Sequence, residues 1–166
     1  FFLIIASGNG HLPLLSILLE QKNLNINGID KWLATTALSH AVQSGQLHAI
    51  DMLLNQPGID VNDNTFPHTL PVLILAIRST QPTDIKINII ERLLEHTHTN
   101  PNIRHYPHTA LDYATTLKNQ SERGKIISIM RKHGAHRNDE TFEYAVYDAT
   151  KWIISIIKLA ISSPWN

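Results

Sequence analysis

Residues 36–62 read TALSHAVQSGQLHAIDMLLNQPGIDVN, and this stretch decides the fold. A short apolar helix is predicted up to Gly45, because glycine takes the left-handed conformation that ends a helix at little cost. Apolar residues between Leu47 and Leu54 then recur at helical spacing, which predicts a second helix. Pro57-Gly58 ends this helix, and a short extended tail with Asn62 follows. The stretch therefore predicts two helices joined by a turn, with a tail behind them.

The same unit occurs four times along the 166 residues. A small alanine marks each first helix, and the separations between these alanines are 35, 35 and 38 residues by subtraction; they are Ala6, Ala41, Ala76 and Ala114. A period in this range indicates a solenoid. One helix pair has too little apolar surface to be stable alone, so we expect the pairs to stack into an all-α solenoid. Stacked repeats build long surfaces rather than closed pockets, which favours a binding function.

Several short motifs in these units resemble the ankyrin repeat family. They are Asn9-Gly10-His11-Leu12, Leu18-Leu19-Glu20, Asp60-Val61-Asn62 and His133-Gly134-Ala135. The resemblance covers residues 1–138. It implies an ankyrin-type solenoid of helix–turn–helix repeats with hairpin or loop fingers, which holds other proteins on a concave face. We expect the repeats at 1–29, 30–63, 64–102 and 103–138, with the first one truncated because the chain begins inside it.

The third and fourth units depart from this pattern. The distance from the marker alanine to the first residue of the following Leu pair is 12 residues in the first two units, and 17 and 16 residues in the others. The glycine after the first helix is also missing there, so we expect longer loops at 81–83 and 119–121. The histidine of the family motif is replaced by Ser39, Ile74 or Asp112, which puts its helix-end hydrogen bonds in doubt.

Residues 139–166 follow a different pattern. One apolar face at 3.6-residue spacing predicts a helix that caps the last repeat. A second apolar stripe, formed by Tyr147, Ile154 and Ile161, lies off that face. It predicts contact with a further domain or with a second copy of the chain.

Composition narrows the classes of function. Lys+Arg and Asp+Glu both number 14, so the chain lacks the basic surface that nucleic-acid binding requires. Cysteine is absent, which excludes disulfides and cysteine zinc sites and fits a reducing, cytoplasmic compartment. The apolar run 152–161 is half the roughly 20 residues that cross a membrane, so no membrane span is predicted.

The resemblance implies that fingers and first helices contact a partner protein. Tyr, Trp and Arg are the usual hot spots of such interfaces. Trp32, Phe66 and Tyr106 are predicted to form an aromatic ladder along successive finger tips, although each ring could instead pack on its own hairpin. The full set of predicted contact residues is Trp32, Phe66, His68, Arg104, His105 and Tyr106 on the fingers, and His40, Gln43, Leu75, Arg78 and Tyr113 on the first helices.

Catalytic motifs, cofactor loops and metal-ligand spacings are absent from the sequence. Gly8-Asn9-Gly10 has no third glycine and is interpreted as a helix-ending turn. The ten histidines match no zinc motif. We therefore predict a non-enzymatic protein–protein interaction module with no cofactor and no metal. The alternatives are a targeting fragment of a larger enzyme or effector, and a scaffold that associates through its terminal helix. The composition is also similar to that of ankyrin-containing virulence effectors, which intracellular bacteria deliver into the host cytoplasm.

Overall fold

The computed structural model describes residues 1–30, 35–63, 70–105 and 107–137 of the chain. These residues form four pairs of α-helices and one short hairpin, which confirms the predicted all-α solenoid of stacked helix pairs. The predicted capping helix at 139–166 lies outside the described residues. The elements are α1 (Phe2–Gly8), α2 (Leu12–Leu19), α3 (Ala37–Gln43), α4 (Leu47–Leu54), α5 (Val72–Arg78), α6 (Thr83–Glu95), β1 (Arg104–His105), β2 (His108–Thr109), α7 (Ala110–Thr115) and α8 (Gln120–Lys132).

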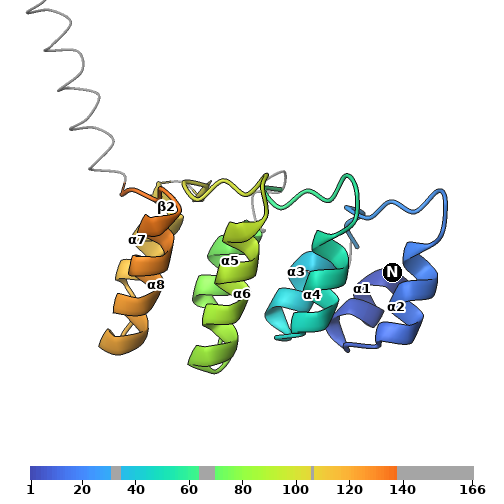
Figure 1. Ribbon diagram of the computed structural model, residues 1–166, viewed down its shortest axis with the longest axis horizontal. Coiled ribbons are helices and arrows are strands. Elements are labelled where there is room, and N and C mark those ends of the chain that lie inside the picture. Colours follow the sequence, from blue (N-terminus) through green and yellow to red (C-terminus); the bar gives the residue numbers. More distant parts are fainter. Residues whose placement is uncertain (31–34, 64–69, 106, 138–166) are drawn as a thin grey trace, which may run out of the picture.

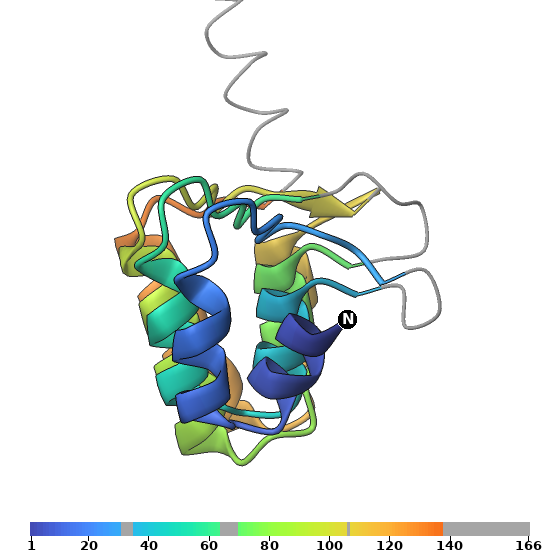
Figure 2. The same cartoon turned by 90° about the vertical axis from the view of Figure 1, so that its right-hand side faces the viewer.

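The helix pairs stand side by side in a row, and the segments that join one pair to the next run along one edge (Figure 1). Seen along the row, the first helices α1, α3, α5 and α7 form one layer and the second helices α2, α4, α6 and α8 form the other (Figure 2). The segments that join one pair to the next extend beyond the stack on the side of the first helices. This side, with the fingers above it, is called the first-helix face below.

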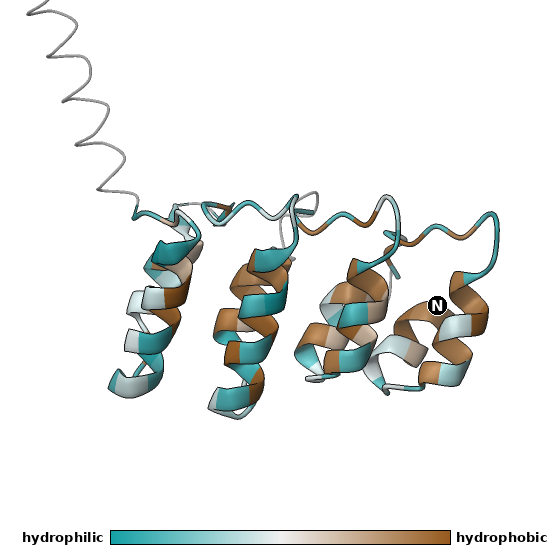
Figure 3. Cartoon of the chain, viewed as in Figure 1, coloured by the Kyte–Doolittle hydropathy of each residue, from teal (hydrophilic) through white to brown (hydrophobic). Residues whose placement is uncertain are grey.

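The core runs between the two layers. All four marker alanines are buried, as a close approach of neighbouring first helices requires. The first residue of the Leu pair in the second, third and fourth units fills the space between successive helix pairs, and these residues, Leu53, Leu93 and Met130, are fully buried. Figure 3 shows the same arrangement, with apolar ribbon turned inward between the helices.

The connections in the third and fourth units are longer, as expected, but by one residue only. The α5–α6 and α7–α8 connections, 79–82 and 116–119, are one residue longer than the connections 9–11 and 44–46. The remaining extra residues lengthen the second helices, which have 13 residues in α6 and α8 against 8 in α2 and α4. Helix-starting signals explain the difference: Pro82 precedes α6, and the Asn119 side chain accepts hydrogen bonds from the backbone N–H groups of Ser121 and Glu122. The insertion is therefore an added helical turn.

Two turn glycines lie where a side chain of the next repeat packs closely against the turn. Gly10 and Gly45 have φ values of 64° and 71°, in the left-handed region that glycine adopts without strain. A Cβ atom on them would lie 2.4 Å from Oε1 of Gln46 and 2.6 Å from Oε1 of Gln81, respectively. Gln81 also donates from Nε2 to the carbonyl of Gln43 (2.8 Å). The predicted helix-ending turns thus also make room for a glutamine of the next repeat.

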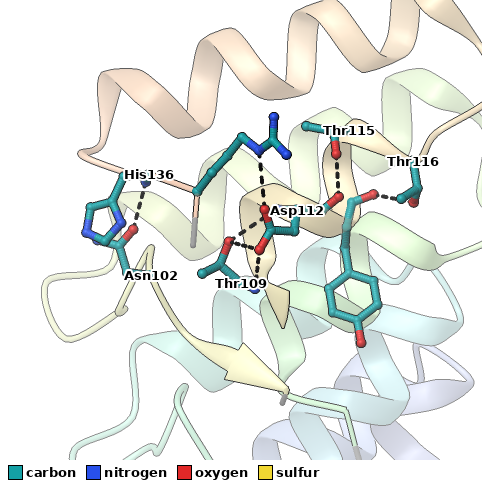
Figure 4. Close-up of polar contacts among 8 residues, drawn as sticks. Asn102, Thr109, Asp112, Thr115, Thr116 and His136 are labelled. Atoms are coloured by element: carbon teal, nitrogen blue, oxygen red, sulfur yellow. Dashed lines mark hydrogen bonds and ion pairs between the residues drawn. The ribbon is translucent and has the colours of Figure 1, made fainter. Parts of the chain in front are cut away.

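Asparagines in the extended tails connect the repeats along the loop edge. Asn27 donates from Nδ2 to the carbonyl of Gly58 and accepts from the N–H of Asp60, both at 2.8 Å. Asn62 and Asn102 make the same pair of hydrogen bonds one and two repeats later. Their partners are His98 and Asn100 for Asn62, and Gly134 and His136 for Asn102. Figure 4 shows the hydrogen bond between Asn102 and His136. A single side chain thereby satisfies a donor and an acceptor of the neighbouring tail.

Two of the three units that lack the family's histidine still have a side-chain cap at the start of the first helix, whereas α5 has none. In α3 the hydroxyl of Thr36 accepts from the N–H of Ser39 (3.1 Å). In α7 the Thr109 hydroxyl accepts from the N–H of Asp112, and the Asp112 carboxylate accepts from the N–H and hydroxyl of Thr109 at 2.8 and 2.9 Å (Figure 4). This reciprocal capping box satisfies two backbone donors that a helix start otherwise leaves open.

The capping box is expected to make stability depend on pH. Burial pushes the pKa of Asp112 upward, but hydrogen bonds from Thr109 and the charge of Arg137 outweigh burial, so the pKa is lowered. The unfolded chain has an aspartate pKa of about 3.9. Because the folded pKa is the lower one, the stabilisation is fully present above about pH 4 and is lost as the pH falls through the folded pKa. Urea unfolding between neutral pH and pH 3 should show a smaller acid-induced loss in Asp112→Asn than in the parent chain. Equal losses in both proteins would contradict this assignment.

Two helical glycines are expected to respond oppositely to alanine. A Cβ atom on Gly8 would lie 2.5 Å from Nδ1 and 2.8 Å from Cγ of His40, whose ring is held by a 3.0 Å hydrogen bond to the carbonyl of Ile4. Gly8→Ala should therefore lower the free energy of unfolding by about 1–3 kcal/mol through overpacking. Gly124 in α8 has open space around its Cα, so Gly124→Ala should raise stability by roughly 0.5–1 kcal/mol.

The His40 contact can be tested separately from any general effect at Gly8. His40→Ala removes the ring, and the double variant should lose less than the sum of the two single variants. Additive effects in denaturant unfolding would show that Gly8 and His40 do not restrict each other.

Candidate functional site

The predicted partner-binding residues divide into two groups. Trp32, Phe66, His68 and Tyr106 lie outside the described residues, so the aromatic ladder stays a prediction. Tyr147, Ile154 and Ile161 also lie outside them, and the predicted contact through the terminal helix stays a prediction too. The structure places the other predicted residues on α3, α5, β1 and α7; these are His40, Gln43, Leu75, Arg78, Arg104, His105 and Tyr113.

Three of the predicted residues come together around one aromatic ring. The guanidinium carbon of Arg78 lies 5.7 Å from the centre of the Tyr113 ring, a cation–π distance. Nδ1 of His105 is hydrogen-bonded to the Tyr113 hydroxyl at 3.2 Å. His108 meets the same ring edge-on, with the ring centres 5.8 Å apart. These four residues are called the Tyr113 cluster below.

Local structure explains why the cluster forms. In the β1–β2 hairpin Arg104 pairs with Thr109 and His105 pairs with His108, so the two histidines stand directly opposite each other. The hairpin enters α7 through the Thr109 cap, which sets Tyr113 one turn into the helix. Since α5 packs beside α7 in the first-helix layer, the last residue of α5, Arg78, reaches the ring from the third helix pair.

The helices of the first layer carry few charged residues. Apart from histidine, α1, α3, α5 and α7 carry two charged residues, Arg78 and Asp112. Asp112 is bound to Thr109 and forms an ion pair with Arg137 at 3.5 Å. Arg78 is exposed, and its guanidinium lies over the Tyr113 ring. The cluster therefore joins an aromatic surface to an exposed cation.

Other predicted residues have different surroundings. His40 is half-buried between α1 and α3 and donates to the carbonyl of Ile4, so its ring takes part in stacking of the repeats. Gln43 is exposed at the end of α3, and its backbone carbonyl accepts from Gln81. Leu75 is half-buried one turn before Arg78 and packs against the core. Arg104 is exposed on the hairpin.

Sequence reasoning missed His108 as a member of the site. The available signal was its place opposite His105 in a short hairpin, with two residues between them. The prediction included His105 among the contact residues but left out His108.

Metal-ligand groups and membrane-spanning helices are both absent from the described part of the chain. Within residues 1–30, 35–63, 70–105 and 107–137, no three His, Asp or Glu side chains are grouped as metal ligands. Between repeats two and three lies a cavity of about 20 Å³, which holds one water molecule at most. No helix in these ranges is long and apolar enough to cross a membrane.

Comparison with known proteins identifies the family of the first repeats. A family model described as ankyrin repeats in three copies matches residues 1–65. This match confirms the ankyrin resemblance. Among solved structures, an ankyrin repeat domain from Acinetobacter baumannii AYE is similar with a TM-score of 0.49 and 23% identity, covering 81% of each chain. No curated protein matches this chain.

Proposed function

We propose that this chain of ankyrin repeats binds a partner protein on its first-helix face, with the Tyr113 cluster as an anchor. Ankyrin repeats are generally protein–protein interaction modules, and the fold is typically non-enzymatic. The observation that supports a site at this position is the convergence of Arg78, His105 and His108 on one tyrosine ring. Arginine and tyrosine are enriched among residues that carry most of the binding energy in interfaces.

The cluster suits binding because it is already ordered. Tyr113 is half-buried and contacts Arg78, His105 and His108, so its side chain would lose little entropy when a partner binds. Apart from Arg78, Asp112 and histidine, the first helices α1, α3, α5 and α7 carry no charged residue, and they would provide the surrounding contact area. The predicted finger residues Trp32, Phe66 and Tyr106 would extend this surface along the stack.

Arg78→Ala is expected to weaken partner binding by about 2 kcal/mol, a loss typical of a hot spot. Proteins captured on the immobilised chain would be identified by quantitative mass spectrometry, and the affinity of each direct partner would be measured by calorimetry. Arg78 is exposed, so the variant should unfold at nearly the parent temperature. Tyr113→Phe keeps the ring but removes the hydroxyl bond to His105, and it should have a smaller effect than Arg78→Ala.

Lys125→Ala provides the matched control. Lys125 is an exposed cation on α8, in the layer of second helices. If Lys125→Ala weakens binding as much as Arg78→Ala, the interaction is a general charge effect and the proposed site is wrong. The proposal also fails if direct partners bind the Arg78→Ala and Tyr113→Ala variants with unchanged affinity.

A further inference from the structure

A groove lies between α6 and α8 in the layer of second helices. Its volume is about 700 Å³, and residues of both helices line it. The apolar residues of the lining are Ile87 and Ile129, which are both half-buried. Gly124 leaves the α8 wall without a side chain at its position, and nothing lies within 4 Å of the place of its missing Cβ atom. Asp84 and Glu91 lie on the α6 wall, so the groove combines an apolar surface with two carboxylates.

The preceding pair of second helices shows what occupies the corresponding place elsewhere in the stack. Asp51 on α4 and Glu91 on α6 both stand two residues before the first residue of their Leu pair. On the following helix, Arg92 of α6 and Ile129 of α8 both stand one residue before it. Arg92 pairs with Asp51, with Nε 2.7 Å from Oδ1. The α6–α8 interface therefore keeps the carboxylate and has isoleucine at the place of the arginine.

The carboxylates of the groove are left without a cation. Within residues 1–30, 35–63, 70–105 and 107–137, Asp84 and Glu91 form no ion pair, not even with Lys125 on the opposite wall. Glu91 is half-buried, so its charge is partly removed from water without a partner that compensates for the loss. The remaining residues of the chain include no arginine, so they cannot supply a guanidinium to this place.

We propose that the α6–α8 groove binds an arginine side chain of a partner protein. The guanidinium pairs with Glu91 as Arg92 pairs with Asp51, and Asp84 adds a second negative charge on the same wall. Arginine suits the site because its planar fork matches a carboxylate, and its aliphatic stem covers apolar residues such as Ile129. The groove belongs to the second helices and the Tyr113 cluster to the first helices, so this is an interaction surface additional to the proposed one.

Nuclear magnetic resonance of the full 166-residue chain with labelled isoleucine methyl groups tests the proposal. The probe is the peptide N-acetyl-Leu-Arg-Leu-amide. The methyl signals of Ile87 and Ile129, assigned by their loss in Ile87→Val and Ile129→Val, are expected to shift and saturate during the titration. A peptide with citrulline in place of arginine keeps the shape without the charge, and a peptide with lysine keeps the charge without the fork. Both should bind more weakly, and equal affinity for either one would overturn the assignment to arginine.

Variants of the chain test the position of the site. Glu91→Gln should raise the dissociation constant of the arginine peptide by about fivefold, as expected for a partly exposed ion pair. Glu20→Gln, which removes an exposed carboxylate at the end of α2, should leave it unchanged. Lys125→Ala removes a like charge from the opposite wall, so this variant should bind at least as tightly as the parent chain.

Ile129→Arg places an arginine where the preceding interface has Arg92. The new side chain should pair with Glu91 and abolish peptide binding, and an unfolding temperature no lower than that of the parent chain would show that the variant is folded. The proposal is overturned if the arginine peptide causes no saturable shift of the Ile87 and Ile129 signals. It is also overturned if Glu91→Gln and Ile129→Arg both bind the peptide with the parent affinity.

Discussion

Replacing Lys86 with methionine is expected to lower the free energy of unfolding by about 3–5 kcal/mol. Lys86 on α6 reaches Glu122 on α8, with Nζ 2.7 Å from Oε1 and side chains only 7% and 11% exposed. Removing the lysine leaves the Glu122 carboxylate buried without its partner, and desolvation of an unpaired charge is expensive. Urea unfolding followed by circular dichroism measures the loss, with an unchanged denaturant slope as the sign that the unfolding reaction is the same.

Two further variants test the cause of this loss. Lys86→Met combined with Glu122→Met removes both charges, and it should recover most of the lost stability because an apolar pair of similar size is often as stable as a buried ion pair. Arg92→Met breaks the ion pair with Asp51, whose side chains are 31% and 43% exposed, and should lose only up to about 1 kcal/mol. Similar losses for Lys86→Met and Arg92→Met would show that burial of the first pair does not matter.

Leu53→Ala is expected to lower the free energy of unfolding by about 2–5 kcal/mol. Leu53 is the first residue of the Leu pair in α4, and its side chain is fully buried between neighbouring helix pairs. The truncation leaves a cavity in the core that joins the repeats. Denaturant unfolding measures the effect, and Leu14→Ala in α2 is the matched control because Leu14 is 37% exposed. The layer-filling role of Leu53 is wrong if both variants lose the same amount.

Local sequence signals predicted most of the fold. The alanine period and the glycine turn at Gly45 depend on residues close together in the chain, and the structure confirms the stacked helix pairs that they indicated. The added residues of the third and fourth units were misinterpreted as loop. Pro82 and Asn119 precede the longer helices α6 and α8, but the prediction placed both residues in loops because the turn glycine is missing.

The candidate site was predicted in part. Arg78, His105 and Tyr113 were each expected on the binding face, but nothing in the sequence showed that they share one ring, and His108 was not included. The buried pair of Lys86 and Glu122 was not predicted at all, since lysine and glutamate in a helix normally face solvent.

The sequence by itself determined the repeating helix pair, because turn glycines, small alanines and apolar spacing act within about 35 residues of chain. Only the tertiary structure decided which side chains meet between repeats. His40 with Ile4, Lys86 with Glu122 and Arg78 with Tyr113 are each separated by roughly one repeat in the sequence. Their contacts depend on the rotation and spacing with which one helix pair packs on the next, and no local preference specifies that geometry.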